Sequence, residues 1–481
     1  MPYLLIEDFA AGIDLRKSAI TAPAGTLRLL TNATITAGGE IEKRKTITSL
    51  GTLPPGLTHG LAFVGGNLLV FGLTPTGSVT GLPPAVTYQQ LAVAGQEAID
   101  RVLDVQIFAG KVYAVVRFVG GIIRHYYDGA LVPSTQAQGT SIRAHKTKLY
   151  ATDKSNLRFS GIKNAVNWTT ATGNGIIDVT VEDAGEAELV GLEEYFGALA
   201  LFGRTTVQIW QMDPDPALNS IQQVLGNTGL VARNAVARFG SGDVLFLSDT
   251  GIRSLRARDI QSAAAVNDIG APVDLLVTSR RAVLTSDLAD KLTALVDPLT
   301  GHFWLVWGNE AVVLAAYPQS KVSAWSLFDF NRPVDYITQA NSRVVLRSGD
   351  DLFIYGSVPT TGNPFDPNTP IGISAALYDA TPVEVITPFL DLSRPATVKL
   401  WEAMDLSCTG TWEVYVCPSI PPQGTDPVWT LIATVDGPTW ELGRLPIEMS
   451  STHLAVRLVS VGTGPATISS MALHHDLAEE S

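Results

Sequence analysis

One short pattern recurs along most of this sequence and limits the folds that it can adopt. Its clearest example lies between Val236 and Arg256, where three apolar stretches are separated by two polar turns that contain glycine. The turns are 240–243 and 248–251, and the last stretch, 252–255, alternates apolar and polar residues. Short strands joined by tight turns form an antiparallel meander. The pattern therefore predicts small antiparallel sheets as the building block of the fold.

Similar meanders follow one another at fairly even intervals. Their first strands are expected to begin near residues 60, 104, 141, 189, 236, 294 and 336. Most of these intervals fall near the roughly 40 to 50 residues that one four-stranded propeller blade needs. A blade buries its faces only against neighbouring blades, so the array is stable when it closes into a ring. We expect an all-β protein built on a β-propeller of about seven blades.

The regions on either side of the meanders have a different sequence texture. Residues 1–57 predict an extended N-terminal arm with platform strands, and the propeller is expected to span 58–358. The proline-rich stretch 359–370 has the composition of a loop and marks a boundary. Six or more alternating segments without helix then predict a C-terminal β-sandwich over 371–481.

A short helical insertion is expected within the propeller, at 257–291. Its polar and apolar spacing predicts one or two helices, for which Asp268 or Ser286 could serve as the N-cap. We expect this insertion to protrude from the ring, and protruding segments are common partner-binding surfaces.

Charge and composition exclude several classes of protein. The net charge of −13 argues against a nucleic-acid grip, because neutralising phosphates requires a basic face. No apolar run approaches the roughly 18 residues of a membrane span, so we expect no membrane insertion. Glu7 and Asp8 interrupt the apolar N-terminus, and no signal peptide is expected there. Cys408 and Cys417 are too few for a disulfide framework; they bracket a predicted hairpin and are expected to be free buried thiols.

Five groups of residues could carry chemistry, and each has a structural explanation that we favour. Asp249-Thr-Gly251 spells an aspartyl-protease tripeptide, but no second copy supplies the partner carboxylate, so it predicts a turn. His474 and His475 could ligate a metal, yet neighbours on a strand point to opposite faces, and we expect one exposed imidazole. The acidic stretch of Glu182, Asp183, Glu186, Glu188, Glu193 and Glu194 could bind calcium, but lacks EF-hand spacing and favours a solvated face.

The basic cluster Lys43-Arg44-Lys45, with Arg28, could contact phosphate, although such charges more often decorate a strand edge. Trp304, Trp307 and Trp325 could form a platform that stacks on sugars, although aromatic residues in alternating strands more often pack between blades. We therefore predict no catalytic, cofactor-binding or metal-binding residues, no cofactor and no enzymatic activity.

Several stretches carry a resemblance to a known family. The opening contains Gly12-x-Asp14, Lys17-Ser18, Gly25, Asn32-Ala33, Gly39 and Lys43-Arg44. Three inner stretches also match: Leu-Arg-Phe-Ser-Gly at 157–161 with Asn-Trp-Thr at 167–169, 201–210 (Leu-Phe-Gly-Arg-Thr-Thr-Val-Gln-Ile-Trp), and 243–254. Together they resemble the tail tubular, or nozzle, proteins of short-tailed bacteriophages, which are also called packaged-DNA stabilisation proteins. The resemblance covers roughly residues 5–260.

The resemblance implies a structural virion protein. Nozzle proteins form a hexameric ring below the portal and adaptor, and the genome passes through this distal tail tube during packaging and ejection. The implied partners are further copies of the chain, the head-to-tail adaptor, a tail fibre or spike, a tail needle or plug, and double-stranded DNA that passes without specific binding. The implied location is the virion tail, after assembly in the bacterial host cytoplasm. In this family the propeller lies outside the tube, and strands from separate segments form a platform around the channel.

Electrostatics is consistent with that role. Six chains at −13 would sum to about −78, and a repulsive lumen would lower the tendency of DNA to stick. We therefore expect acidic residues to face the lumen of such a tube. Two alternatives remain open. One is a propeller that recognises host glycan through loop aromatics, and the other is a glycoside hydrolase with two carboxylates at the ring centre.

Overall fold

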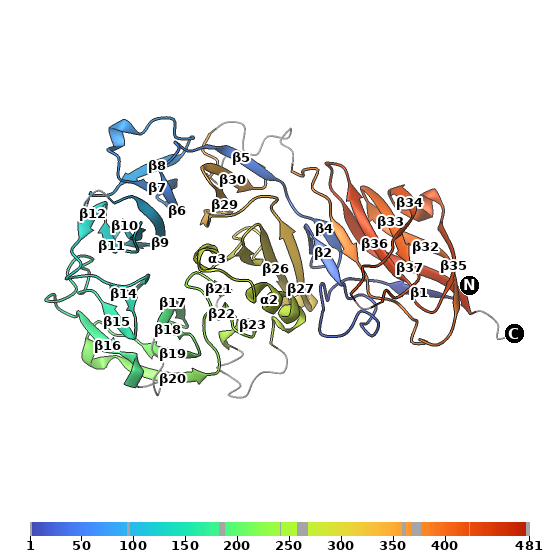
Figure 1. The fold of residues 1–481 in the computed structure, drawn as a ribbon, viewed down its shortest axis with the longest axis horizontal. Coiled ribbons are helices and arrows are strands. Elements are labelled where there is room, and N and C mark those ends of the chain that lie inside the picture. The colour runs from blue at the N-terminus through green and yellow to red at the C-terminus, as the bar shows by residue number, and fades with distance from the viewer. Residues whose placement is uncertain are drawn as a thin grey trace.

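The computed structural model describes residues 2–93, 97–181, 188–240, 242–256, 268–357, 362–366, 377–422 and 424–477. Strands dominate it, and they form a ring of small sheets beside a two-layered sandwich (Figure 1). The helices described within these ranges are η1 (Thr76–Ser78), η2 (Val179–Val181), η3 (Pro216–Leu218), η4 (Ala271–Val273), α2 (Asp274–Arg281), α3 (Ser286–Lys291), η5 (Pro318–Ser320) and α4 (Thr439–Leu442).

Seven blades make up the ring in the described part of the chain, and the first four follow one another directly. Blade 1 contains β6 (His59–Val64), β7 (Asn67–Gly72) and β8 (Val86–Gln90). Blade 2 contains β9 (Ile99–Phe108), β10 (Lys111–Phe118), β11 (Ile123–Tyr127) and β12 (Ala130–Val132). Blade 3 contains β13 (Ser141–His145), β14 (Lys148–Asp153), β15 (Asn156–Phe159) and β16 (Gly175–Asp178). Blade 4 contains β17 (Leu189–Tyr195), β18 (Ala198–Gly203), β19 (Thr206–Gln211) and β20 (Ser220–Gly226).

The last three blades are built less uniformly. Blade 5 contains β21 (Val236–Phe239), β22 (Asp243–Ser248) and β23 (Gly251–Ser254). Blade 6 contains β24 (Thr293–Val296), β25 (Phe303–Trp307), β26 (Glu310–Tyr317) and β27 (Val322–Asp329). Blade 7 contains β28 (Tyr336–Ala340), β29 (Arg343–Ser348), β30 (Asp351–Tyr355) and, from the N-terminal region, β5 (Ile47–Thr52).

The innermost strands contact one another all the way around the ring, in the order β6, β9, β13, β17, β21, β24, β28 and back to β6. This closed circuit confirms the predicted all-β propeller. The observed first strands begin at residues 59, 99, 141, 189, 236, 293 and 336, close to the predicted positions. The polar turn residues predicted these strand positions well, because each blade is a series of short hairpins.

The ring is closed by a strand that comes from outside the repeats. β5 pairs antiparallel with β30 as the outer strand of blade 7, with Ile47 opposite Tyr355 and Ser49 opposite Phe353. The expected arm of residues 1–57 is therefore not a separate unit, since its last strand belongs to the propeller. One blade thus combines the two ends of the propeller sequence, and its pairing ties the ring shut.

The sandwich is also assembled from distant parts of the chain. One sheet contains β1 (Tyr3–Ile6), β3 (Ala33–Ile35), β4 (Ile41–Lys43), β37 (Thr467–Leu477), β32 (Lys399–Thr409) and β35 (Leu445–Ser451). The facing layer contains β2 (Leu29–Thr31), β31 (Glu384–Ile386), β36 (Ala455–Val461), β33 (Thr411–Cys417) and β34 (Thr430–Asp436). Four N-terminal strands therefore complete a sandwich that was predicted from the C-terminal residues alone.

Propeller and sandwich share a continuous sheet. β2 pairs in parallel with β27 of blade 6 and antiparallel with β31, so one sheet of nine strands runs from the blade into the sandwich (Figure 1). Close packing reinforces the joint at Gly12, whose φ is +56°, because a Cβ there would lie 2.7 Å from the carbonyl oxygen of Trp325. The buried apolar side chains of this joint belong to the same core as the sandwich interior.

The insertion is helical where the structure describes it, and residues 257–267 of the predicted insertion lie outside the described residues. Neither predicted N-cap is used by the two helices. Thr285 caps α3 by accepting a hydrogen bond from the Leu288 backbone N–H, and α2 follows directly on η4 without a side-chain cap. α2 packs on β23, the last strand of the three-stranded blade 5. The helix thus covers a sheet edge.

A buried histidine in blade 2 makes the stability of the ring depend on pH. His125 is 2% exposed; its Nε2 lies 3.1 Å from the carbonyl oxygen of Gly139 and its Nδ1 lies 3.1 Å from the hydroxyl of Tyr113. A carbonyl can only accept, so Nε2 carries the proton and Nδ1 accepts from Tyr113. Burial lowers the pKa of His125 to about 4.

The sign of the effect follows from this lowered pKa. The unfolded chain has a histidine pKa of about 6.5 and binds the proton first as the pH falls, so folding stability is fully present above that value. Between pH 6.5 and 4, His125 alone should remove about 3 kcal/mol. Urea unfolding measured across this range should show a smaller pH dependence in a His125→Gln variant. If the variant keeps the full pH dependence of the parent protein, His125 does not cause it. Some pH dependence will remain in the variant, because burial also lowers the pKa of His59 and His302.

Candidate functional site

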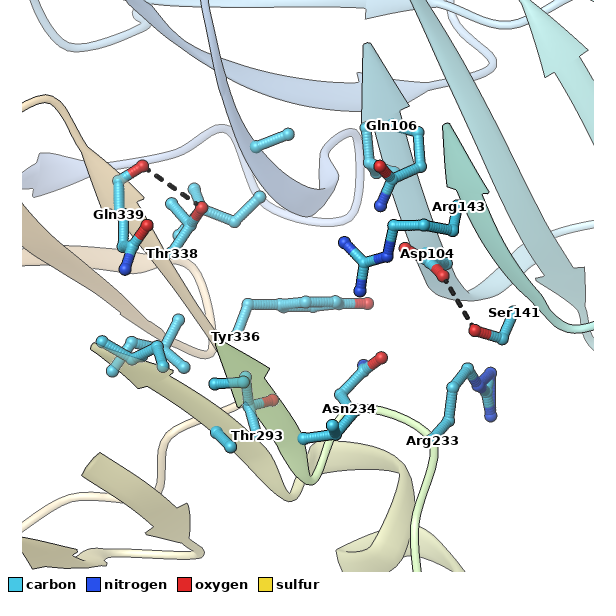
Figure 2. Close-up of a pocket in the computed structure, with 18 of the residues that line it drawn as sticks. Asp104, Gln106, Ser141, Arg143, Arg233, Asn234, Thr293, Tyr336, Thr338 and Gln339 are labelled. Carbon is cyan, nitrogen blue, oxygen red and sulfur yellow. Dashed lines mark hydrogen bonds between the residues drawn. The ribbon is translucent and has the colours of Figure 1, made fainter. Parts of the chain in front are cut away.

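A cavity of about 800 Å³ lies at the centre of the propeller, where the innermost strands meet. Residues of β6, β9, β13, β17, β21, β24 and β28 line it, so it is the hub of the ring (Figure 2). Four arginines and three carboxylates stand among the described lining residues: Arg101, Arg143, Arg233, Arg238, Asp104, Glu193 and Glu194. The hub wall therefore has one excess positive charge, although the whole chain has a net charge of −13.

Helix α3 reaches one end of the hub and ties several blades together. Asp290, on α3, forms ion pairs with Arg117 of blade 2 at 2.6 Å and with Arg233 just before blade 5 at 3.1 Å. Lys291 pairs with Asp335, next to blade 7, at 3.1 Å. The insertion was expected only to protrude; instead, its second helix forms ion pairs with residues in or next to blades 2, 5 and 7.

Arg101 and Tyr336 form a second link at the same end. The guanidinium of Arg101 lies 4.2 Å from the ring centroid of Tyr336 and donates to the backbone oxygen of Asp335 at 2.6 Å. The Tyr336 hydroxyl accepts a hydrogen bond from the Val102 N–H at 3.3 Å. Both side chains are thereby fixed where they link blades 2 and 7 across the hub, past blade 1, which lies between them in the ring.

An acidic pair lies deeper in the hub. The Asp104 carboxylate accepts from the Ile142 N–H at 2.8 Å and from the Ser141 hydroxyl at 3.3 Å. Burial raises the pKa of Asp104, although the positive charges of Arg143 and Arg233 act in the opposite direction. Glu193 accepts from Arg143 Nη2 at 2.7 Å, and its side chain is 6% exposed. The hydrolase alternative needs two carboxylates at the ring centre; these two lie there, and each is already engaged by protein donors.

Two hub arginines keep nitrogen atoms that have no partner within the described part of the chain. Arg143 uses Nη2 for Glu193 and for the backbone oxygen of Leu192, while its Nε has no hydrogen-bond partner. Arg233 uses Nη2 for Asp290, while its Nε and Nη1 have none. Burial lowers the pKa of Arg233 against the attraction of Asp290 and Asp104, a sign of incomplete charge compensation. Orphaned donors of this kind call for an explanation.

The hub site was not predicted from the sequence. Its strongest signal was the charge in strands that are otherwise apolar: Arg101 in β9, Arg143 in β13 and Glu193 in β17 are charged residues in the first strand of their blades. The first strand of each blade lines the hub, so such charges face the centre. The acidic stretch had instead predicted a solvated face, which is wrong for Glu193; Glu182, Asp183 and Glu186 lie outside the described residues.

The basic cluster of the N-terminal region does not decorate an edge. Lys43 and Arg44 are 2% and 3% exposed. Lys43 Nζ donates to the backbone oxygens of Asp379 and Gly462 at 2.8 and 3.0 Å, and Arg44 has five protein partners. Arg28 donates to the backbone oxygens of Asp14 and Lys17. The cluster therefore joins propeller and sandwich, and its buried members offer nothing to a phosphate.

The tryptophans are packing residues, as we favoured. Trp304, Trp307 and Trp325 are 1%, 6% and 0% exposed, so they form no sugar platform. Trp304 packs edge-on against Phe328 and Tyr355 between blades 6 and 7.

The protease-like tripeptide is the predicted turn, between β22 and β23, where Asp249 pairs with Arg281 at 2.7 Å. Both histidines of the 474–475 pair are buried, which corrects the expected exposed imidazole; His474 lies 2.7 Å from Asp405 and His475 lies against Trp401. In the described ranges, no three His, Cys, Asp or Glu side chains gather closely enough to hold a metal ion.

The cysteines are free and buried, as expected. Their strands, however, do not form the predicted hairpin. β32 pairs with β35 and β37, whereas β33 pairs with β34 and β36. Gly410, with φ of +77°, turns the chain from one layer of the sandwich into the other.

The sequence and the fold can now be compared with those of known proteins. No family model and no curated protein sequence matches the chain. Its fold is similar to BamB from Moraxella catarrhalis, with 11% identity, 65% of this chain and 97% of that chain covered, and a TM-score of 0.36. It is also similar to the Pan2 WD40 domain of Neurospora crassa, with 12% identity, 66% and 98% covered, and a TM-score of 0.35. Kluyveromyces lactis Hsv2 matches at 10% identity, 49% and 73% coverage and a TM-score of 0.29.

The assignment of a β-propeller rests on the closed ring of sheets, since these TM-scores are low. The helices in the described ranges are all too short or too polar to cross a lipid bilayer.

Proposed function

We propose that this protein is a structural component of a bacteriophage tail: the distal tube, or nozzle, which forms a hexameric ring and conducts DNA. The observation that carries the proposal is the position of the residues that resemble the nozzle family. Gly12, Asn32 and Arg44 all belong to the joint between blade 6 and the composite sandwich. The resemblance thus falls on residues that unite propeller and platform.

Asn32 illustrates how specific that joint is. It has φ of +59° and is 4% exposed. Its amide nitrogen donates to the backbone oxygen of Pro382, while its side-chain oxygen accepts from Arg44 Nε and from the Asp329 N–H. One small side chain therefore connects the N-terminal region, blade 6 and the sandwich, through an asparagine that tolerates the left-handed conformation.

A role as a tail tube would account for this joint between propeller and sandwich. Strands from three parts of the chain share two sheets, so no single linker separates the propeller from the platform. In the proposed assembly, six platforms surround the DNA and the propellers lie outside, where adaptor, fibre or spike, and needle or plug can dock. The hub of one propeller is a different feature from the lumen of that tube. The expectation that acidic residues face the lumen stays a prediction.

The proposal is tested by mass. Native mass spectrometry and sedimentation of the full chain should give a hexamer of the 51.2 kDa protomer, either alone or after mixing with a portal–adaptor ring. A ring with a central hole should then be visible by electron microscopy. A protein that stays monomeric under both conditions, and binds a glycan array instead, would reject the nozzle in favour of the receptor alternative.

A further inference from the structure

We propose that the hub of the propeller is a binding site for a small ligand that carries an oxyanion, a carboxylate or a phosphate, held by Arg143 and Arg233. This site is separate from the proposed passage of DNA and does not depend on it. Its volume of about 800 Å³ is within the range of pockets for small molecules.

The unpartnered nitrogens determine the chemical class of the ligand. Arg143 Nε and Arg233 Nε and Nη1 are buried donors with no acceptor among the residues that the structure describes. Leaving such donors unpaired is costly, and more so for charged groups. Guanidinium offers only donors, and its planar fork matches the oxygens of carboxylate and phosphate. An oxyanion therefore supplies what the hub lacks.

Both arginines are already held in place. Glu193 and the Leu192 carbonyl fix Arg143 through Nη2, and Asp290 fixes Arg233 through Nη2. The side chains are 27% and 15% exposed. Binding of a ligand would therefore cost little side-chain entropy at these two arginines, which favours affinity.

Neutral donors extend the site toward α3. Figure 2 shows Arg143, Tyr336 and Asn234 pointing toward one another across the cavity. The Tyr336 oxygen accepts from Val102, which leaves its own proton free to donate. The side-chain nitrogen of Asn234 donates one long hydrogen bond, of 3.4 Å, to the Leu103 carbonyl oxygen. Asp104 and Glu193 are carboxylates beside the site. Asp104 is engaged by Ile142 and Ser141 and Glu193 by Arg143, which limits their repulsion of an anion.

The experiment is a titration of the full chain by calorimetry and thermal shift at constant ionic strength. The probes are inorganic phosphate, sulfate and glucuronate, with chloride and neutral glucose as controls. We expect saturable binding of at least one oxyanion and none of glucose. Preference for phosphate would identify a phosphorylated ligand, and preference for glucuronate would identify an acidic sugar.

Two variants locate the binding. Arg143→Gln and the charge-retaining Arg233→Lys should each weaken binding by about tenfold or more, since charge-assisted hydrogen bonds from the guanidinium groups are lost. Arg158→Gln is the matched control: this arginine lies on β15 of blade 3, pairs with Asp153 at 2.6 Å, and should leave binding unchanged. The proposal fails if all three oxyanions bind more weakly than about 10 mM, or if Arg158→Gln and the folded hub variants behave alike.

Discussion

Deletion of residues 1–52 is expected to leave a chain that does not fold, in either the propeller or the sandwich. Blade 7 would lose β5, its outer strand, and the sandwich would lose β1, β2, β3 and β4. The deleted segment also carries apolar side chains that are buried in the common core: Ile6, Phe9, Ile13, Leu27, Leu30, Ala33, Ile35 and Ile41. Burial of each larger one stabilises by about 1.5–3 kcal/mol, and their sum is as large as the total stability of about 5–15 kcal/mol that a folded domain has.

The deletion is measured by expression, size-exclusion chromatography and near-ultraviolet circular dichroism. We expect aggregated protein without the tertiary signal of packed aromatic side chains. The control is a deletion of residues 1–6, which removes only β1, a strand paired with β37 alone. That shorter protein should remain folded with a lower melting temperature. A soluble, monomeric propeller without residues 1–52 would show that β5 does not close the ring.

The sequence predicted the blades because a blade is a local structure. The turn at 248–251 and the strands on either side of it lie within one meander, and polar turn residues with glycine determine where each hairpin reverses. Every predicted first strand was therefore close to an observed one. Blade 1 departs from the pattern, since β8 pairs in parallel with β7, and no local signal indicates a parallel partner.

Pairings between distant segments could not be predicted from such signals. β5 and β30 alternate like many other strands here, and nothing in 47–52 specifies a partner some 300 residues away. The same limit explains the error at Gly410. A glycine between two alternating strands usually indicates a hairpin, but here it connects opposite layers of the sandwich, because β37 and β36 lie where the hairpin partners would be.

The hub was missed for a related reason. Arg143 and Arg233 are 90 residues apart, and only ring closure brings their side chains to one cavity. Sequence motifs identify sites whose residues are close along the chain, or spaced as a known fold requires. A propeller hub is lined by residues from the first strand of every blade, so its chemistry becomes visible only after the register of every first strand is known.

Replacement of Arg44 by methionine is expected to destabilise the protein by about 3 kcal/mol or more, within the range measured for breaking a buried ion pair. The guanidinium is 3% exposed and donates to Asn32, Thr381, Asp379 and the backbone oxygens of Lys45 and Asp329. Burial acts to raise the pKa of Asp379, but the charge of Arg44 and hydrogen bonds from Thr381 outweigh it and lower that pKa. The variant would remove one donor from this charge and from each of four other acceptors.

The neighbouring residue provides the matched control. Lys45→Met also removes one positive charge, but Lys45 is about one-third exposed; it pairs with a similarly exposed Glu42 at 3.3 Å and donates to the Tyr378 hydroxyl at 2.7 Å. An exposed pair contributes about 0–1 kcal/mol and a single hydrogen bond about 0.5–1.5 kcal/mol, so this variant should lose less stability than the Arg44 variant. Urea denaturation at constant pH measures both. Equal midpoints for the two variants would show that Arg44 does not hold propeller and sandwich together, because charge removal alone would then account for the loss. A large loss of stability in the Arg44 variant only would show that this side chain holds the N-terminal region, blade 6 and the sandwich together.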